Sequence, residues 1–116
     1  MLYSRNGDDG NTTMFRCAKK VSKSSTIVEA LGALDEVNSF LGLCKIRAGE
    51  QHVILNAGAP LATIITDIQS TLFIIQAELA GFSGTITEQH VIHIEEVTNT
   101  IEKELPKIKS FLLSGG

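Results

Sequence analysis

Residues 26–44, TIVEALGALDEVNSFLGLC, decide the fold class of this 116-residue chain. Apolar side chains recur here at spacings of three and four residues, which is the period of one face of an α-helix. They are Ile27, Leu31, Leu34, Val37, Leu41 and Cys44. Thr26 followed by Glu29 three residues later has the pattern of a capping box, so we expect the helix to begin there.

Two more segments show the same period. Pro60, after a loop over residues 51–59, suits the first turn of a second helix that Gly81 and Gly84 would end. Its apolar face is Leu61, Ile64, Ile68, Leu72, Ile75 and Leu79. A third helix is predicted from near Thr85 or Thr87 until Pro106. Its apolar face is Val91, Ile94, Val97, Ile101 and Leu105.

These elements predict a single all-α domain over residues 1–116, an up-and-down helical bundle. Residues 1–25 are expected to be an irregular segment, and residues 26–116 to form the bundle. The apolar tail that ends in two glycines suggests that the chain is truncated at its C-terminus.

Composition excludes several classes of function. The net charge of -3 argues against a nucleic-acid partner. No stretch reaches transmembrane length and the N-terminus has no signal-like apolar region, so we expect a cytoplasmic protein without a membrane partner. Cys17 and Cys44 form neither a disulfide framework nor a zinc spacing.

The N-terminal stretch YSRNGDDGNTT, residues 3–13, carries the candidate chemistry. Gly7 and Gly10 permit tight turns whose N–H groups can point at an anion. Arg5 offers a fork of donors for phosphate, Lys23 a point charge, and Asp8 a ligand for Mg²⁺. Neutral hydroxyl donors stand at Ser4, Thr12 and Thr13. On composition alone, a polar disordered terminus is the slightly favoured interpretation.

His90, His93 and Glu96 recur at spacings of three on the third predicted helix. This spacing can place ligands on one face, but a solvated polar face is the favoured interpretation. We therefore predict no metal site formed by the side chains of this helix.

Several motifs together resemble the PduO-type ATP:cob(I)alamin adenosyltransferases. Residues 3–10, YSRNGDDG, are similar to the N-terminal signature of that family, and residues 28–42, VEALGALDEVNSFLG, to its first-helix motif. Residues 68–80, 86–88 and 110–116 resemble later segments in the right order. Ser4, Leu31 and Ser114 depart from the family pattern, where Thr, Tyr and Pro are usual.

The resemblance implies a five-helix bundle, of which about three helices are present here, assembled as a homotrimer. It implies transfer of the 5′-deoxyadenosyl group of ATP to the cobalt of cob(I)alamin (cobalamin as substrate, with Mg²⁺), giving adenosylcobalamin and triphosphate. Asp35 falls on an aspartate that pairs with an arginine of a neighbouring subunit, and Phe111 on an aromatic residue that lines the corrinoid side. The nucleotide-binding positions are Ser4, Arg5, Asn6, Gly7, Asp8, Gly10, Thr12, Thr13 and Lys23.

Two other functions stay open at this point. One is a non-catalytic nucleotide- or corrinoid-binding or assembly module of the same fold. The other is a plain helical scaffold, in which Arg5 and Lys23 would contribute nothing to nucleotide affinity.

Overall fold

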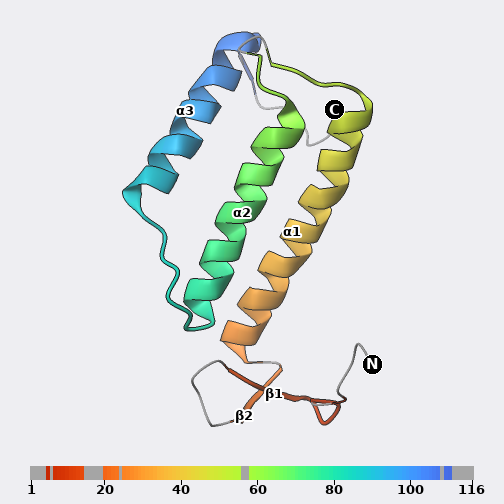
Figure 1. Ribbon diagram of the computed structural model, residues 1–116, viewed down its shortest axis with the longest axis vertical. Helices are drawn as coiled ribbons and strands as arrows, with labels where there is room; N and C mark the ends of the chain where they lie inside the picture. Colours follow the sequence, from red (N-terminus) through yellow and green to blue (C-terminus); the bar gives the residue numbers. More distant parts are fainter. Residues whose placement is uncertain are drawn as a thin grey trace.

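The computed structural model describes residues 5, 7–14, 20–23, 25–55, 58–107 and 109–110. This part of the chain contains three helices, α1 (Thr26–Glu50), α2 (Leu61–Leu79) and α3 (Glu88–Glu104), and two short strands, β1 (Asn11–Thr13) and β2 (Lys20–Ser22). The helices run up and down beside one another, and the strands lie beyond the N-terminal end of α1 (Figure 1). The predicted all-α bundle is confirmed. None of the described helices has the length and apolar character needed to span a bilayer.

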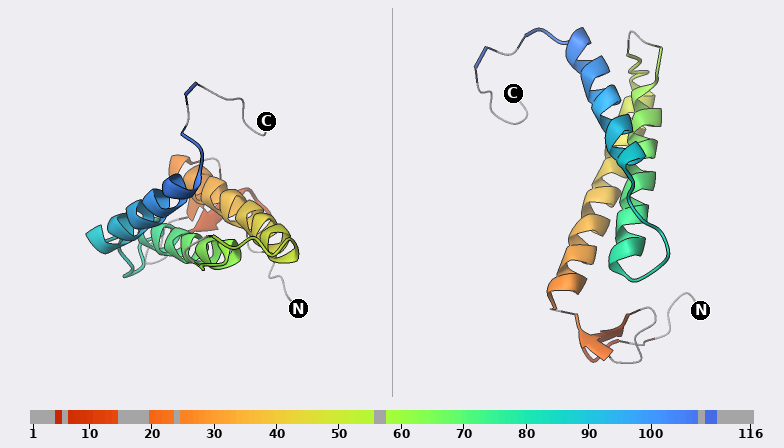
Figure 2. Two further views of the ribbon diagram at one scale, coloured as in Figure 1. Left: turned by 90° about the horizontal axis from the view of Figure 1, so that it is seen from above. Right: turned by 90° about the vertical axis from the view of Figure 1, so that its left-hand side faces the viewer.

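The two strands are a difference from the expected irregular N-terminal segment. β1 and β2 pair antiparallel, with Thr12 opposite Val21 at the centre of the register. The backbone N–H of Lys23 donates to the carbonyl of Gly10 at 2.9 Å and continues the pairing. Strands of three residues are too short for an alternating pattern to show in the sequence, which is why they were missed. Figure 2 shows this hairpin as a separate layer below the helices.

The start of α1 corrects the predicted capping box. Ser25, not Thr26, is the N-cap, and it makes no side-chain capping bond. The N–H of Glu29 instead donates to the carbonyl of Ser25 at 2.9 Å, as the first helical hydrogen bond. Thr26 already has helical geometry, so its hydroxyl is one residue too late to cap the free N–H groups.

The core lies where α1 packs against α2, the helix pair with the most extensive contact among the described elements. Its buried residues are Ala48, Ile64, Ile65 and the polar Asn38. The prediction for α1 was right for three of its apolar positions, which are half-buried, at Leu31, Leu34 and Leu41.

Three other predicted core positions of α1, Ile27, Val37 and Cys44, are exposed. The face toward α2 is centred on Asn38, and Val37 and Cys44 lie roughly 100° to 120° around the axis from it. The apolar spacing alone therefore predicts a buried face whose centre is rotated around the helix axis from the observed one. Ile27 is only one residue inside the helix start and has few neighbours to cover it.

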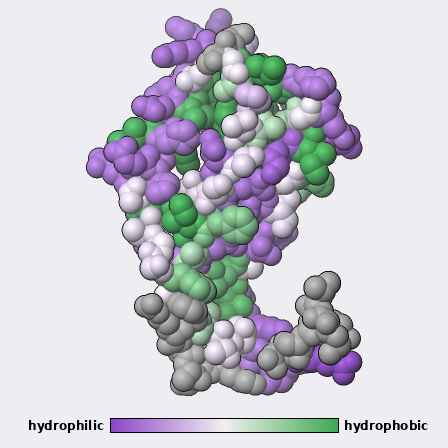
Figure 3. Space-filling view, in the orientation of Figure 1, coloured by the Kyte–Doolittle hydropathy of each residue, from purple (hydrophilic) through white to green (hydrophobic). Residues whose placement is uncertain are grey.

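Helix α3 begins at Glu88 with Thr87 as its N-cap, in agreement with the predicted start near Thr85 or Thr87. The N–H of Thr87 donates to Nδ1 of His90 at 3.0 Å, in a reciprocal capping box. Apolar side chains of α3 remain open to the surface, among them Val91, Ile94 and Leu105. Figure 3 shows apolar patches between the polar side chains of one face of the molecule. The predicted inward face of α3 is therefore only partly covered in this chain.

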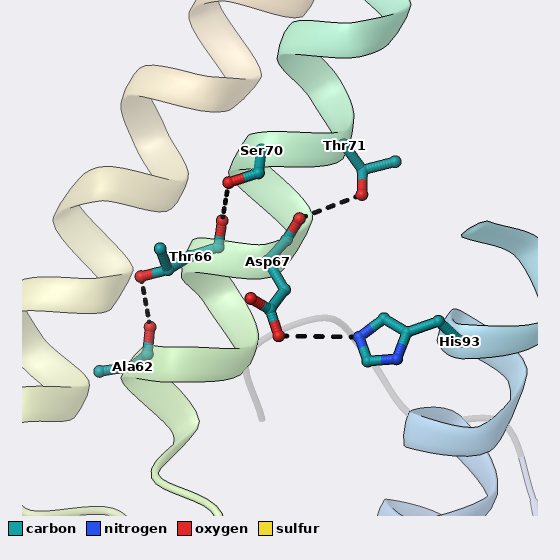
Figure 4. Close-up of polar contacts among 6 residues, drawn as sticks. All are labelled: Ala62, Thr66, Asp67, Ser70, Thr71 and His93. Atoms are coloured by element: carbon teal, nitrogen blue, oxygen red, sulfur yellow. Dashed lines mark hydrogen bonds and ion pairs between the residues drawn. The ribbon is translucent and has the colours of Figure 1, made fainter. Parts of the chain in front are cut away.

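One side-chain contact between α2 and α3 joins His93 to Asp67. Nε2 of His93 lies 3.6 Å from a carboxylate oxygen of Asp67, and both side chains are about half exposed (Figure 4). Asp67 neighbours Thr66 and Ser70, whose hydroxyls donate back to carbonyls of their own helix. His90 and His93 thus serve a helix cap and a helix–helix contact, and they do not converge on one point.

The carboxylate of Glu78 organises the connection between α2 and α3. It accepts the backbone N–H of Ile86 at 3.0 Å and the hydroxyl of Thr85 at 2.8 Å. These two hydrogen bonds lower the pKa of Glu78 below its ordinary value, because they favour the charged form. The bond from the backbone of Ile86 has the larger effect.

This geometry predicts an acid-dependent loss of stability. A carboxylate with a lowered folded-state pKa stabilises the fold above the unfolded-state pKa, and this contribution is lost as the pH falls through the folded-state value. We expect Glu78→Gln to reduce the thermal midpoint at pH 7 and to flatten its fall between about pH 5 and pH 3. Circular dichroism melts at several pH values measure this. Glu95→Gln on exposed α3 is the control, and equal pH profiles for both variants would contradict the role of Glu78.

Candidate functional site

The turn before β1 contains two glycines with left-handed backbone geometry. Gly7 and Gly10 have φ values of 92° and 82°, in the left-handed region that glycine enters without strain. The N–H of Gly10 donates to the carbonyl of Gly7 at 3.2 Å, and the N–H of Asp8 to that of Arg5 at 3.3 Å. The chain thus reverses tightly over residues 7–10. Successive N–H groups in such turns form concave sites that attract anions.

Arg5 shares this unusual geometry. Its φ is 62°, a left-handed value that side chains with a Cβ rarely adopt and that costs about 1 kcal/mol or more. Backbone strain of this kind clusters at ligand-binding segments. The conformation of Arg5 therefore adds a structural reason to include it in the candidate site.

The side chain of Lys23 lies across the turn. A Cβ added to Gly7 would lie 3.3 Å from Cε and 3.4 Å from Nζ of Lys23, and only 2.7 Å from the backbone carbonyl of Asn11. The absent side chain of Gly7 therefore leaves room for both the ammonium group and the hairpin backbone. Lys23, at the end of β2, and the turn at residues 7–10 are brought together by the strand pairing, although 16 residues separate Lys23 from Gly7.

The remaining predicted residues of the N-terminal segment take different positions. Thr12 and Thr13 are consecutive in β1, so their side chains leave opposite faces of the hairpin. The carboxylate of Asp9 accepts the N–H of Asn11 at 3.1 Å, while Asp8 is exposed at the tip. Three predicted site residues, Ser4, Asn6 and Phe111, lie outside the described residues, as does Cys17.

Asp35 lies apart from the turn. It is on α1, nine residues after Thr26, and therefore about 13 Å along the helix axis from its start. It lines a groove of about 370 Å³ between α1 and α2. The α1 wall consists of Asp35, Asn38, Ser39 and Lys45, and the α2 wall of Thr66, Gln69, Ser70 and Phe73.

The chain therefore offers two distinct chemical environments. The turn at residues 7–10 combines turned backbone with the ammonium group of Lys23 and suits phosphate. The groove combines a carboxylate, the ammonium group of Lys45, amides, hydroxyls and an aromatic ring. Among the described residues, no cluster of three or more His, Cys, Asp or Glu side chains is arranged to hold a metal ion.

Sequence reasoning named the turn residues but missed the groove as a site. Asn38 and Gln69 are linked by side-chain hydrogen bonds at its base. The available signal was a polar residue, Asn38, at the centre of an apolar period. It could not reveal its partner, because the partner lies 31 residues away on another helix.

Comparison with known proteins bears on both environments. A family model described as cobalamin adenosyltransferase matches residues 2–116. The chain is 34% identical over 122 residues to the corrinoid adenosyltransferase PduO of Citrobacter freundii, covering 98% of this chain and 33% of that protein. It is 33% identical over 119 residues to the corrinoid adenosyltransferase of Bacillus subtilis, covering 99% of this chain and 58% of that protein.

Solved structures agree in fold. A phenylalanine-to-alanine variant of a PduO-type ATP:corrinoid adenosyltransferase from Lactobacillus reuteri, complexed with cobalamin and ATP, superposes with a TM-score of 0.82 at 28% identity. The match covers 100% of this chain and 64% of that one. An arginine-to-lysine variant from the same organism, complexed with ATP, gives 0.78 at 29% identity, covering 98% and 63%.

The chain spans 33% of the length of the Citrobacter freundii relative and 58% of the Bacillus subtilis relative. The family model covers nearly all of this chain, from residue 2 to residue 116. Along the chain, the two strands come first and the three helices follow. The chain belongs to the cobalamin adenosyltransferase family.

Proposed function

We propose that this chain binds ATP and a corrinoid and transfers the 5′-deoxyadenosyl group of ATP to the cobalt of cob(I)alamin. The observation that carries the proposal is the turn at residues 7–10, in which Gly7 and Gly10 are left-handed and the side chain of Lys23 lies against Gly7. Support also comes from the family match and from the Lactobacillus reuteri structure complexed with cobalamin and ATP.

The N-terminal segment is proposed to hold the triphosphate of ATP. Arg5 and Lys23 offset its negative charge, while the open space at Gly10 leaves room for close approach of phosphate oxygens. Further contacts are proposed for Ser4, Asn6, Asp8, Thr12 and Thr13.

Mg²⁺ is proposed to accompany the nucleotide, with Asp8 as its protein ligand. Asp8 is an exposed carboxylate at the tip of the turn. A single carboxylate suits Mg²⁺, which usually keeps several waters and takes one or two carboxylates together with substrate phosphates. When bound, the ion supplies positive charge beside the triphosphate.

The reaction asks for positioning and charge neutralisation from the protein. The cobalt lone pair of cob(I)alamin attacks C5′ of ATP, a cobalt–carbon bond forms, and the C5′–oxygen bond breaks with its electron pair leaving on triphosphate. No proton is transferred at the reacting atoms, so no general acid or base is needed. Preorganised cations at the turn stabilise the leaving group, and binding of both substrates at one site aligns them.

Two further roles complete the proposal. Phe111 is proposed to line the corrinoid side and to exclude the lower axial ligand of cobalt. Asp35, exposed on α1, is proposed to pair with an arginine of a neighbouring subunit in a cytoplasmic homotrimer with ATP between subunits. An exposed carboxylate at the edge of a groove is accessible to such a partner.

Anaerobic turnover tests the proposed function. The 116-residue chain is mixed with cob(I)alamin, ATP and Mg²⁺, and adenosylcobalamin is followed by absorbance and triphosphate by chromatography. We expect both products in equal amounts. Binding of ATP without either product would contradict catalysis by this chain and favour a nucleotide-binding module.

Arg5→Ala is expected to weaken ATP binding by roughly tenfold to a hundredfold, because charge-assisted hydrogen bonds contribute about 1.5–3 kcal/mol. Arg5→Lys should recover only part of this, since an ammonium group lacks the planar fork that binds phosphate. Isothermal titration calorimetry measures both affinities. Wild-type affinity in Arg5→Ala would contradict the assignment of Arg5 to the phosphate site.

Gly7→Ala and Gly10→Ala form a matched pair. Both positions have positive φ, so both substitutions strain the backbone. Only at Gly7 would the new methyl group collide with the carbonyl of Asn11 and displace Lys23, since nothing lies within 4 Å of one at Gly10. We expect ATP affinity to fall roughly tenfold further in Gly7→Ala, from an overpacking cost of about 1–3 kcal/mol.

The same calorimetric titration measures both glycine variants. Equal losses would show that strain alone matters and that the approach of Lys23 to the turn does not.

A further inference from the structure

The junction of α1 and α2 contains a reciprocal pair of side-chain amides. Asn38 is 6% exposed and is the one buried polar residue among those the structure describes. Nε2 of Gln69 donates to the backbone carbonyl of Asn38 at 3.0 Å, and Nδ2 of Asn38 lies 3.5 Å from the carbonyl of Gln69. The first of these bonds is well formed, and the second is at the long limit.

Both bonds end on backbone carbonyls, and this makes them sensitive to register. A slide of one helix along the other by one turn, about 5.4 Å, would break both. The aliphatic contacts of Ile64, Ile65 and Ala48 discriminate less between registers, because apolar contact is not directional. A buried amide within an apolar helix junction can therefore specify alignment, as a buried Asn does in coiled coils.

The side chain of Gln69 also lies against Gly42, one turn after Asn38. A Cβ at Gly42 would be 3.5 Å from Nε2 of Gln69, so the amide spans the surface of α1 between these two residues. Gln69 thus contacts α1 at both Asn38 and Gly42.

The groove that contains Asp35 is built around this pair. Asp35 is one turn before Asn38, Ser39 follows it directly, and Phe73 is one turn after Gln69. Because the walls come from different helices, the register decides which α1 groups face Phe73. Resting on the proposed function, we propose that Asn38 and Gln69 are positioning residues that align Asp35 and Ser39 with Phe73 for the transferase reaction.

Both acceptors are backbone carbonyls, so each hydrogen bond can be removed separately by changing its donor side chain. Gln69→Met keeps the length of the side chain and removes its bond to the carbonyl of Asn38, and Asn38→Leu removes only the other bond. Ile65→Val is the matched control, because it loosens the core without altering either amide.

Turnover and ATP affinity are measured for the three variants on the whole chain, with denaturant midpoints. We expect Gln69→Met to lower kcat about tenfold, the equivalent of one well-formed hydrogen bond, and Asn38→Leu to lower it less. The Kd for ATP should stay within about twofold of the wild-type value in both variants, because the turn at residues 7–10 is separate from the helix junction. Ile65→Val should lose about as much stability as the two amide variants but keep kcat near the wild-type value.

The alternatives are distinguishable. If Ile65→Val loses as much kcat as Gln69→Met at equal midpoint, the pair is merely structural and the proposal is wrong. Amide NMR spectra test alignment without any turnover. We expect the resonances of residues 35–39 and Phe73 to move in Gln69→Met and to stay in Ile65→Val, and unmoved resonances in both would overturn the proposal. If the wild-type chain shows no turnover but these shifts appear, the proposed function fails while the alignment stands.

Discussion

The packing of α1 against α2 is the contact on which the other parts of the molecule depend. Its apolar part is small, with Ala48, Ile64 and Ile65 as the buried aliphatic residues of the described chain. The hydrogen bonds between Asn38 and Gln69 add direction to a junction that apolar contact alone would leave free to slide. With these two helices aligned, the two walls of the groove face each other. The hairpin lies beyond the N-terminal end of α1 (Figure 1).

Helix α3 is held differently. Its start is fixed by the carboxylate of Glu78 and by the capping box of Thr87, and its flank by the contact of His93 with Asp67. These are polar and mostly exposed contacts, each of which contributes modestly to stability. The exposed apolar residues of α3 agree with this arrangement, because a few polar contacts cover little of the apolar surface of a helix.

The proposed nucleotide site places cationic side chains at one end of a chain whose net charge is -3. Charge acts locally over about 8–10 Å at physiological salt, so the arrangement around the turn matters more than the sum. Lys23 reaches the turn because the strands pair, and Gly7 leaves the space that the lysine side chain occupies. The strand pairing thus brings Lys23 next to the turn at residues 7–10.

The helices were predictable because each has a sustained period and clear limits, at Pro60, Thr87 and Pro106. The error at Thr26 arose because Ser25 and Thr26 are both good caps, and only the backbone distinguishes them. Val37 and Cys44 were placed inside because a period does not fix the exact direction of the partner helix. The hairpin was too short for a pattern.

For the site, a sequence motif named the turn residues, and their role in nucleotide binding stays a prediction. Arg5, Gly7 and Lys23 could be named from the sequence, but the approach of Lys23 to Gly7 required the strand register. The groove depends on two helices meeting, and neither helix alone contains the information. Its amide pair therefore could be found only in the structure.

The most direct measurement for the central claim is an NMR titration of the labelled chain with ATP, inorganic triphosphate and adenosine. The account predicts that ATP and triphosphate both shift the amides of Gly7, Asp8, Gly10 and Lys23, and that adenosine leaves them unchanged. If ATP shifts only amides elsewhere in the chain and leaves these four unchanged, the result would contradict a phosphate site at the turn of residues 7–10.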